Sequence, residues 1–425
     1  MTMKLKAIKG MNDILPENTS SLRQIESLIH NFFTIHGYEE IRTPIVEKTE
    51  LFKRVVGDQT DIVNKEMYSW IDNDKESLTL RPELTAPTIR SYLENNLDKL
   101  NKVTKLYYIG PAFRRERPQK GRQRQFHQFG VEAIGSLYPE QDAEVISMAY
   151  NIYEMLGIEN LELMINSVGS NISKNNYAKE LKKYLSDYFN DLSDISKERY
   201  TSNPLRILDT KNKKEQDIIN NAPSILEFLS PEDLNHFNDT KRYLDKLNIN
   251  YKVNDKLVRG LDYYTMTTFE IRTDKIGSQD ALCGGGRYNN LVKELGGGSY
   301  PAIGFGAGIE RLMIALGESN EDKKSKIDVF VVSIDDLAII NALKICDKLR
   351  SQLGINVRMD LSRSSFKSQM RQANKLNADY VVILSKEEVK KRVGIIKIMS
   401  TGDQFEVPLD TIHRHFDIET SKNDN

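Results

Sequence analysis

Cysteine, tryptophan and long apolar runs are scarce or absent in this sequence. Its 425 residues include one tryptophan and two cysteines, Cys283 and Cys346. Two distant cysteines exclude a disulfide framework or a zinc cluster, and they fit a reducing compartment. No run of about 18 apolar residues occurs, and segment 1–16 lacks the apolar stretch of a signal peptide, so no membrane span is expected. We therefore expect a cytoplasmic protein.

An excess of either charge is also absent. Lys and Arg together number 60, Asp and Glu 61, so the formal net charge is -1. Binding to RNA would therefore need local basic patches on a near-neutral body. The 39% hydrophobic and 28% charged residues are typical of a soluble folded protein. A chain of 425 residues exceeds one ordinary core, so two or three domains are expected.

Hydrophobic periodicity predicts an α+β architecture for the first part of the chain. We expect helices over 20–36, 86–94 and 142–156, and strands over 38–46, 77–80, 105–109 and 128–134. Two of these strands enclose an arginine-rich loop in the manner of a hairpin. This pattern indicates an antiparallel sheet with helices packed on it.

The rest of the chain changes character twice. Residues 171–250 predict a helical insertion, followed by strand-like sequence over 257–271 and a glycine-entered helix over 304–316. The polar segment 318–326 is the best linker. After it, alternating strands and helices predict a small α/β domain with a parallel sheet. We thus expect a domain over 1–325, with the insertion at 171–250, and a second domain over 326–425.

The arginine-rich loop is the first candidate for chemistry. It runs from Gly110-Pro111-Ala112-Phe113-Arg114-Arg115-Glu116-Arg117, through Lys120, Arg122 and Arg124, to Phe126. Arginine suits phosphate binding because its planar fork holds phosphate oxygens bidentately and stays charged. A solvated basic loop is the alternative, and it has about equal weight from these residues alone.

A glycine-rich segment over 302–312 is the second candidate. Its glycines would let the backbone approach a ligand, with Arg311 in the first turns of a helix. A helix entry packed on the sheet is an equal alternative. The Walker A and dinucleotide GxGxxG patterns are absent, which excludes the commoner nucleotide-binding loops.

Two shorter segments complete the set. Glu83 and Thr85 stand at the end of a strand where a helix begins, and Thr85 is also a good N-cap. Arg259 precedes Tyr263 and Tyr264 across a glycine, although tyrosines in strands usually serve packing.

Together these segments resemble the histidyl-tRNA synthetases over nearly the whole chain, from 9–13 to the C-terminal domain. Arg114, Glu116 and Phe126 are similar to class II motif 2, and 306–311 to motif 3. The helix and strand ending at Pro44 are similar to motif 1, which builds the dimer interface in this class. Further matches are the two histidine-specific signatures at 259–264 and 284–288, and the segments 119–122 and 166–170.

The resemblance implies a class II catalytic domain and an anticodon-binding α/β domain like that of class IIa synthetases. It implies a homodimeric histidine–tRNA ligase that makes histidyl-adenylate from ATP and L-histidine and transfers histidine to tRNA(His), releasing AMP and pyrophosphate. Mg²⁺ is expected with ATP, held mainly by its phosphates. No zinc, organic cofactor or metal-binding side chain is expected.

The resemblance also assigns residue roles. Arg114 and Arg259 are the expected catalytic residues, both at the α-phosphate, and Arg311 is expected at the γ-phosphate. The expected ATP site is Arg114, Glu116, Phe126 and Arg311. The expected histidine site is Glu83, Leu84, Thr85, Arg114, Gln128, Glu132, Arg259, Tyr263 and Tyr264. The residues expected to touch the tRNA acceptor stem are Arg117, Gln119, Lys120 and Arg122.

Two other functions share this fold. One is a synthetase paralogue that regulates ATP phosphoribosyltransferase in histidine biosynthesis, and the other is a non-catalytic tRNA-sensing module. The paralogue generally lacks the anticodon-binding domain and loses signature residues. The presence of Arg114, Arg259, Tyr263, Tyr264 and Arg311 and of the last domain argues against the paralogue. The intact arginines also argue against the tRNA-sensing module.

Overall fold

The computed structural model describes residues 5–57, 60, 62–277, 281–317 and 327–420. The chain forms two compact units, Met1–Ser319 and Asn320–Asn425. The domain boundary predicted after residue 325 and the linker 318–326 lie outside the described residues. Among the helices described, none has the length and apolar character that a membrane crossing requires.

An eight-stranded sheet organises the first unit. Its inner neighbours are antiparallel, and only the outer pairs β1–β5 and β7–β8 are parallel. The strands, in spatial order, are β1 (Glu39–Glu40), β5 (Thr104–Phe113), β6 (Gln125–Ile134), β11 (Ala302–Gly308), β10 (Ala281–Arg287), β9 (Thr265–Arg272), β7 (Glu162–Ser167) and β8 (Lys252–Val253). This sheet confirms the predicted α+β class.

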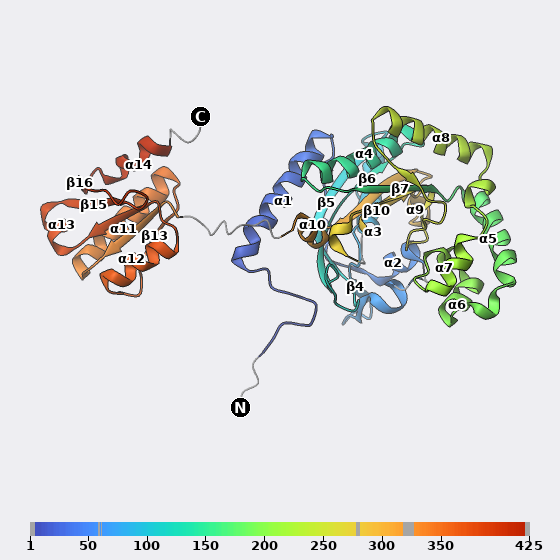
Figure 1. Cartoon of the computed structure of the whole chain (residues 1–425), viewed down its shortest axis with the longest axis horizontal. Helices are drawn as coiled ribbons and strands as arrows, with labels where there is room; N and C mark the ends of the chain where they lie inside the picture. The colour runs from blue at the N-terminus through green and yellow to red at the C-terminus, as the bar shows by residue number, and fades with distance from the viewer. Residues whose placement is uncertain (1–4, 58–59, 61, 278–280, 318–326, 421–425) are drawn as a thin grey trace. The chain divides into compact units, whose positions relative to one another are not determined.

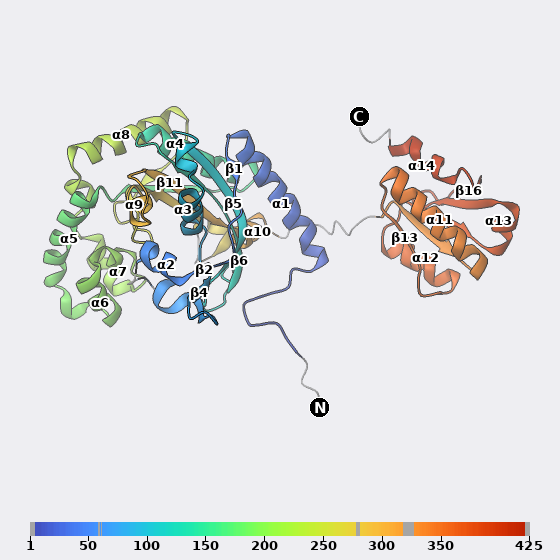
Figure 2. The same ribbon diagram turned by 180° about the vertical axis from the view of Figure 1, so that it is seen from behind.

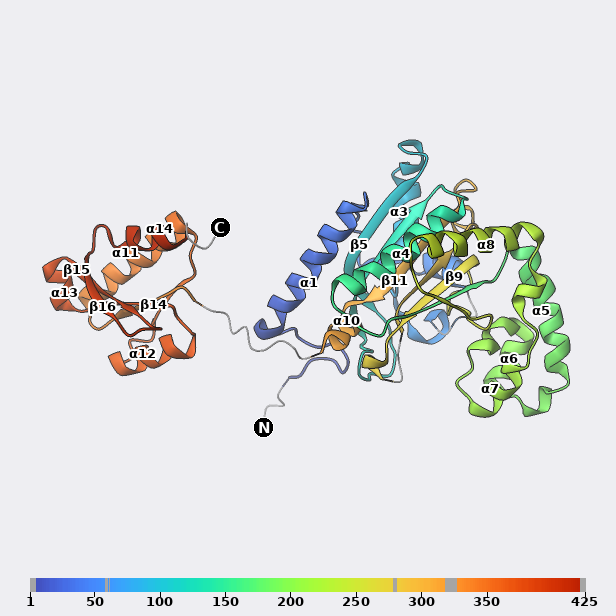
Figure 3. The same cartoon turned by 45° about the horizontal axis from the view of Figure 1, so that its top comes forward.

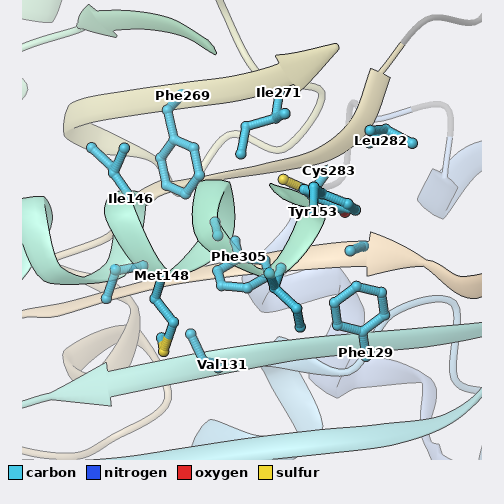
Figure 4. Packing of buried hydrophobic residues seen from close by; sticks show 14 of the residues in the cluster. Phe129, Val131, Ile146, Met148, Tyr153, Phe269, Ile271, Leu282, Cys283 and Phe305 are labelled. Atoms are coloured by element: carbon cyan, nitrogen blue, oxygen red, sulfur yellow. The ribbon is translucent and has the colours of Figure 1, made fainter. Parts of the chain in front are cut away.

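One face of the sheet carries the main hydrophobic core. Helices α1 (Pro16–Ile35) and α4 (Pro139–Met155) pack on this face (Figure 3). Side chains alternate along a strand, so Phe129 and Val131 of β6 and Phe305 of β11 all point toward these helices. Figure 4 shows these three side chains near Ile146, Met148 and Tyr153 of α4, with Cys283 beside Tyr153.

The opposite face carries the intervening residues of the same strands. Ile134 and Ala302 join a second core there with helices α2 (Thr49–Val56), α3 (Thr85–Glu94) and α9 (Leu291–Glu294). A small antiparallel sheet of β2 (Val46–Lys48), β4 (Ser77–Leu80) and β3 (Tyr68–Ile71) accompanies them (Figure 2).

The predicted helical region 171–250 is helical. We call 171–246 the helical segment; it lies beside the sheet (green in Figure 1) and has a hydrophobic core of its own that includes Tyr177, Leu181 and Ile207. Its elements are α5 (Asn171–Ser186), α6 (Asp194–Ser202), η4 (Pro204–Asp209), α7 (Lys213–Asn220) and α8 (Pro231–Lys246), with short turns at Phe189–Asp191 and Ile225–Phe228. The other short helices of the unit are η1 (Ile62–Glu66), η2 (Leu97–Lys99), η6 (Asp274–Ile276) and α10 (Ile309–Leu316).

The second unit is a five-stranded sheet with helices. The parallel strands that the sequence predicts are β13 (Val357–Met359), β12 (Val329–Ser333) and β14 (Tyr380–Leu384). Two antiparallel strands that were not predicted, β15 (Val393–Ile398) and β16 (Gln404–Pro408), extend the edge. The helices are α11 (Asp336–Leu353), α12 (Phe366–Lys375), α13 (Lys386–Lys391) and α14 (Ile412–Thr420).

Three predicted elements were wrong in detail. The strand over 38–46 is two short strands, because Pro44 cannot donate a ladder hydrogen bond. Residues 257–264 form no strand, and β9 begins at Thr265. Residues 304–308 belong to strand β11, because their backbone pairs with strands β6 and β10. The helix begins only at Ile309.

Candidate functional site

A cavity of about 780 Å³ opens on the second face of the sheet. Arg114 follows β5, Arg259 precedes β9, and Arg311 lies in the first turn of α10, yet all three line this cavity. The other predicted site residues in its lining are Glu83, Thr85, Glu116, Arg122, Phe126, Gln128, Tyr263 and Tyr264. Leu84, Glu132, Arg117, Gln119 and Lys120 are not among the lining residues.

Glycines in the central strands make room for these side chains. A Cβ on Gly304 would lie 1.8 Å from Oε2 of Glu132, and one on Gly306 would lie 2.0 Å from Nε2 of Gln128. Side chains of β6 thus lie across the backbone of β11. A larger residue at either glycine would displace a predicted ligand-binding side chain.

Arg114 is held at the cavity wall by the strand-to-helix turn. Its Nε donates a hydrogen bond to the carbonyl of Pro82 at 2.8 Å, and its guanidinium lies 5.3 Å from the Phe126 ring centre. Glu116 lies 3.8 Å from Arg114 and 3.3 Å from Nε of Arg122. These three side chains are therefore ordered by contacts, unlike a freely solvated basic loop.

Arg259 is anchored through one end of its guanidinium. Nη1 pairs with the carboxylate of Glu270, whose other oxygen accepts a 2.5 Å bond from Nε of Arg272. Burial alone would lower the pKa of Arg259, but Glu270 raises it overall. The buried Nε of Arg259 has no hydrogen-bond partner among the described residues. The anchored arginine thus keeps a donor for a ligand.

Arg311 is anchored by backbone carbonyls. Its Nη1 donates to the carbonyl of Ala281 at 2.7 Å, and Nε donates to that of Gly121 at 3.2 Å. Burial, followed by the neighbouring charge of Arg122, lowers the pKa of Arg311. Since the cation is not neutralised by a carboxylate at hydrogen-bond distance in the described structure, a bound anion would stabilise it.

Glu83 replaces Thr85 as the cap of helix α3. Its two carboxylate oxygens accept hydrogen bonds from the backbone N–H of Thr85, at 2.6 Å, and of Ala86, at 2.9 Å. Thr85 is the first residue of the helix, so the N-cap role expected for its side chain was wrong. Burial raises the pKa of Glu83, and the two N–H groups oppose that rise. Glu83 keeps its place in the cavity lining while it caps the helix.

Gln128 and Glu132 project from β6 on the same face of the sheet. The side-chain oxygen of Gln128 is buried without a hydrogen-bond partner among the described residues. Glu132 lies deeper, where it accepts hydrogen bonds from the hydroxyls of Tyr108, at 3.1 Å, and Tyr288. Burial raises the pKa of Glu132 to about 8, so this carboxyl is largely protonated at neutral pH.

Three residues with roles here were missed in the sequence. Glu270 fixes Arg259, while Tyr108 and Tyr288 fix Glu132. A charged residue inside the apolar run Phe269-Glu270-Ile271 was an available signal for Glu270. Tyr288 belongs to the histidine-specific signature 284–288, but no role was predicted for it. Tyr108 could not be singled out in the sequence, because tyrosines are common in strands.

The charge of the cavity favours an anionic ligand. Glu116 and Glu270, two of its carboxylates, are paired with arginines. In the part of the chain that the structure describes, no group of three or more His, Cys, Asp or Glu side chains is placed to hold a metal ion. Arginines with spare donors therefore dominate the chemistry, as a phosphate site requires.

Comparison with known proteins accounts for both units. A model of the histidyl-tRNA synthetase family matches residues 10–312, and an anticodon-binding domain model matches 328–416. The histidine–tRNA ligase of Syntrophotalea carbinolica is 44% identical over 412 residues, which cover 97% of this chain and 98% of that protein.

Solved structures agree with that relationship. The apo histidyl-tRNA synthetase of S. aureus matches with a TM-score of 0.81 and 38% identity, covering 97% of this chain and 100% of that one. An ATP phosphoribosyltransferase regulatory subunit/histidyl-tRNA synthetase from Bacillus halodurans has a TM-score of 0.66 and 23% identity over 91% of this chain and 99% of that one, which shows the fold alone. With its catalytic unit spanned by the family model and a curated relative matched almost end to end, the chain belongs to the histidyl-tRNA synthetase family.

Proposed function

We propose that this cavity carries out histidine–tRNA ligation, with ATP, L-histidine and tRNA(His) as substrates. One observation carries the proposal: Arg114, Arg259 and Arg311 line a single cavity that also contains Tyr263 and Tyr264. Three guanidinium groups suit a triphosphate, and the tyrosines lie beside a wall of polar side chains suited to an amino acid.

In the first step an oxygen of the histidine carboxylate attacks the α-phosphorus of ATP, and pyrophosphate leaves as histidyl-adenylate forms. Such phosphoryl transfer depends on positioning and on charge neutralisation. Arg114 and Arg259 would hold the α-phosphate and the histidine carboxylate, and Arg311 the γ-phosphate. The unpartnered Nε of Arg259 supports this role.

The adenine would lie near Phe126. We propose that Phe126 and Arg311 enclose the ring and that Glu116 accepts from its amino group. All three line the cavity, and the Arg114 guanidinium lies 5.3 Å from the centre of the Phe126 ring, so this ring borders the proposed phosphate site. Mg²⁺ would enter as part of the ATP complex, bound mainly by the phosphates.

Histidine recognition needs acceptors for the ammonium group and partners for both ring nitrogens. We assign Glu83, Thr85 and Gln128 to the ammonium, with Leu84 shaping the turn between them. The unpartnered oxygen of Gln128 supports this assignment.

Glu132 and Tyr264 are assigned to the imidazole, with Tyr263 lining the pocket. The imidazole would reach Glu132 past Tyr263, whose ring centre lies 5.5 Å from that of Tyr288. A neutral Glu132 can both donate and accept a hydrogen bond. Such a polar pocket rejects apolar analogues by about 10⁴-fold or more, so editing is not required.

In the second step the terminal adenosine hydroxyl of tRNA attacks the adenylate carbonyl, and AMP leaves. We propose that Arg117, Gln119, Lys120 and Arg122 meet the acceptor stem. Gln119 and Arg122 close a tight turn through backbone hydrogen bonds of 3.0 and 2.9 Å, and Arg117, Gln119 and Lys120 are exposed. The α/β unit would bind the anticodon. Because basic side chains would contact RNA phosphates, the affinity for tRNA should fall steeply with added salt.

We also propose a homodimer that functions in the cytoplasm. The motif 1 helix α1 exposes Ile35 at its end, and Ile45, Trp70 and Ile71 are exposed in and beside the small sheet. Sedimentation should give twice the chain mass of 48.8 kDa. Cys283 and Cys346 are buried free thiols, which suits a reducing compartment.

The test is ATP–pyrophosphate exchange with each amino acid, followed by aminoacylation of tRNA. Exchange that depends on histidine alone supports the proposal. Absence of exchange with normal binding of tRNA would indicate a tRNA-sensing module. Absence of exchange with stimulation of ATP phosphoribosyltransferase would indicate the regulatory subunit.

A further inference from the structure

The loop 257–264 carries three of the predicted site residues without the support of a strand or helix. Arg259, Tyr263 and Tyr264 all lie in it, between β8 and β9. A loop of this kind keeps one conformation only if other elements hold it. Asn166 of β7 holds the start of the loop through the carbonyl of Leu257. The helical segment holds its middle and end, and residues 208–211 of this segment also line the cavity.

Asp262 is the point at which η4 and the end of α6 hold the loop. Its Oδ1 accepts hydrogen bonds from Nδ2 of Asn203 at 2.9 Å and from Nε of Arg206 at 3.0 Å. Arg206 also donates to the carbonyl of Gly260 at 3.4 Å. One carboxylate oxygen and one carbonyl thus tie the middle of the loop to the helical segment.

Lys174 of helix α5 holds the end of the same loop. Its Nζ donates to the carbonyl of Tyr264 at 3.0 Å and lies 3.4 Å from that of Asp262, so its two contacts flank Tyr263. Burial lowers the pKa of Lys174, and the carboxylates of Asp262 and Glu294 oppose that shift. A partly buried ammonium needs such partners, and here they are loop carbonyls.

The opposite side of Asp262 abuts the catalytic core. A Cβ on Gly57, which follows helix α2 with φ +92°, would lie 2.9 Å from Oδ2 of Asp262. The carboxylate is therefore enclosed between the helical segment and the end of α2. A shift of the helical segment would move this carboxylate and the tyrosines that follow it.

We propose that Lys174, Asn203 and Arg206 are positioning residues, through which the helical segment fixes Arg259, Tyr263 and Tyr264 at the histidine site. The inference rests on the proposed function. Binding of histidine and the position of the helical segment are then coupled. Coupling is reciprocal, so histidine stabilises the contacts that the segment makes with the loop.

Kinetics of ATP–pyrophosphate exchange separate positioning from simple stability. Lys174→Met and Arg206→Met should each lower kcat/KM for histidine by about tenfold to 100-fold, because small displacements at a reacting centre have effects of this size. KM for ATP should change less than KM for histidine, because Arg114 and Arg311, which other elements hold, are also assigned to the phosphates. Arg206→Lys should recover part of the loss. The matched control is Lys182→Met, a lysine of the same helix that bonds to the carbonyl of Thr201 within the segment. It should leave kcat/KM within about twofold of wild type.

A purely structural role would instead lower thermal stability and the active fraction while leaving the ratio of the two KM values unchanged. That result in folded Lys174→Met and Arg206→Met variants would overturn the inference. If ATP–pyrophosphate exchange by the wild-type protein still depends on histidine, the proposed function is supported even when the inference fails. A wild type without histidine-dependent exchange would overturn both.

Hydrogen exchange of the wild-type protein tests the coupling directly. Saturating L-histidine should slow amide exchange in α6 and η4, although these elements lie outside the proposed histidine contacts. The double variant Lys174→Met/Arg206→Met should lose this protection, and Lys182→Met should keep it. Equal exchange with and without histidine in the wild type would contradict the coupling.

Discussion

The hydroxyl of Tyr288 donates a hydrogen bond to the buried carboxyl of Glu132, although 156 residues separate them in the chain. Tyr108 donates to the other oxygen at 3.1 Å. Deep burial raises the pKa of Glu132 to about 8, although the hydrogen bonds from the tyrosine hydroxyls oppose this rise. The proposed imidazole contact therefore has a titration that can be measured.

Glu132 predicts a specific pH dependence of stability. Its pKa is raised from 4.5 to about 8 in the folded protein, so between these values the folded state binds a proton that the unfolded state has lost. Stability is therefore highest below pH 4.5, as far as this group is concerned, and falls as pH rises toward 8. The unfolding free energy of wild type, measured with urea at a series of pH values, should fall more steeply with pH than that of Glu132→Gln. The difference in slope should reach about 1.4 kcal/mol per pH unit. Parallel curves for the two proteins would contradict the protonated state.

Glu132→Ala should also separate histidine binding from ATP binding. Loss of the carboxyl leaves two tyrosine hydroxyls and the imidazole without their hydrogen-bond partner. The affinity for histidine should therefore fall by about tenfold or more. KM for ATP should stay within about twofold, since the proposed phosphate contacts are the arginines and not Glu132. Equal losses for both substrates would remove Glu132 from the histidine site.

Arg259→Ala should nearly abolish adenylate formation while the protein stays folded. Removal of a pre-organised cation at the developing charge costs about 10²–10³ in rate. Arg90→Ala is the matched control, because Arg90 is likewise paired with carboxylates, those of Glu47 and Glu94, but lies outside the cavity. Normal ATP–pyrophosphate exchange in Arg259→Ala would remove this residue from the chemistry.

Asp142→Asn should be strongly destabilising without any change in substrate contacts. Asp142 is fully buried and accepts hydrogen bonds from the fully buried Arg287 and from His236 of α8 at 3.0 Å. Burial opposes ionisation of Asp142, yet Arg287 and His236 together lower its pKa. Neutralising it leaves a buried unpaired guanidinium, at a cost of about 3–5 kcal/mol. Asp239→Asn, in an exposed pair with Arg242, should change unfolding free energy by less than about 1 kcal/mol. Similar effects of the two substitutions would contradict the account.

Gly304→Ala should block the histidine pocket. The new methyl would lie 1.8 Å from the Glu132 carboxyl and 2.3 Å from the carbonyl of Val131, so the strand or the acid must move. Ser186→Ala is the control, since Ser186 is exposed at the end of α5 and lies outside the cavity. We expect a loss of histidine affinity of about tenfold or more for Gly304→Ala only. Calorimetric titration with histidine checks this, and equal affinities for the two variants would contradict the close approach.

The sequence indicated the main elements because their patterns are local. The helices over 142–156 and 171–246 and the hairpin around Arg114 follow from periodicity and from charge placed between strands. The resemblance to a known family then placed Arg114, Arg259 and Arg311 at one site, which the cavity brings together. The assigned roles of these side chains stay predictions until a ligand is bound.

Other features could not be predicted because they depend on pairing across the sheet. A run such as 304–308 suggests a helix entry, and only its pairing with β6 and β10 makes it a strand. The cap of α3 fell to Glu83 because its carboxylate turns back on two N–H groups, a geometry that spacing alone does not fix. The contacts of Lys174 and Arg206 join elements about 56 to 90 residues apart, and no local pattern encodes them.

The central claim is that three guanidinium groups share one triphosphate beside a slot for imidazole. A crystal structure with Mg²⁺–ATP and L-histidinol, the unreactive alcohol of histidine, measures this directly. We predict that Arg114, Arg259 and Arg311 all contact the phosphates, with the imidazole between Tyr264 and Glu132. Phosphates bound away from any of these arginines, or histidinol bound outside this cavity, would contradict the account.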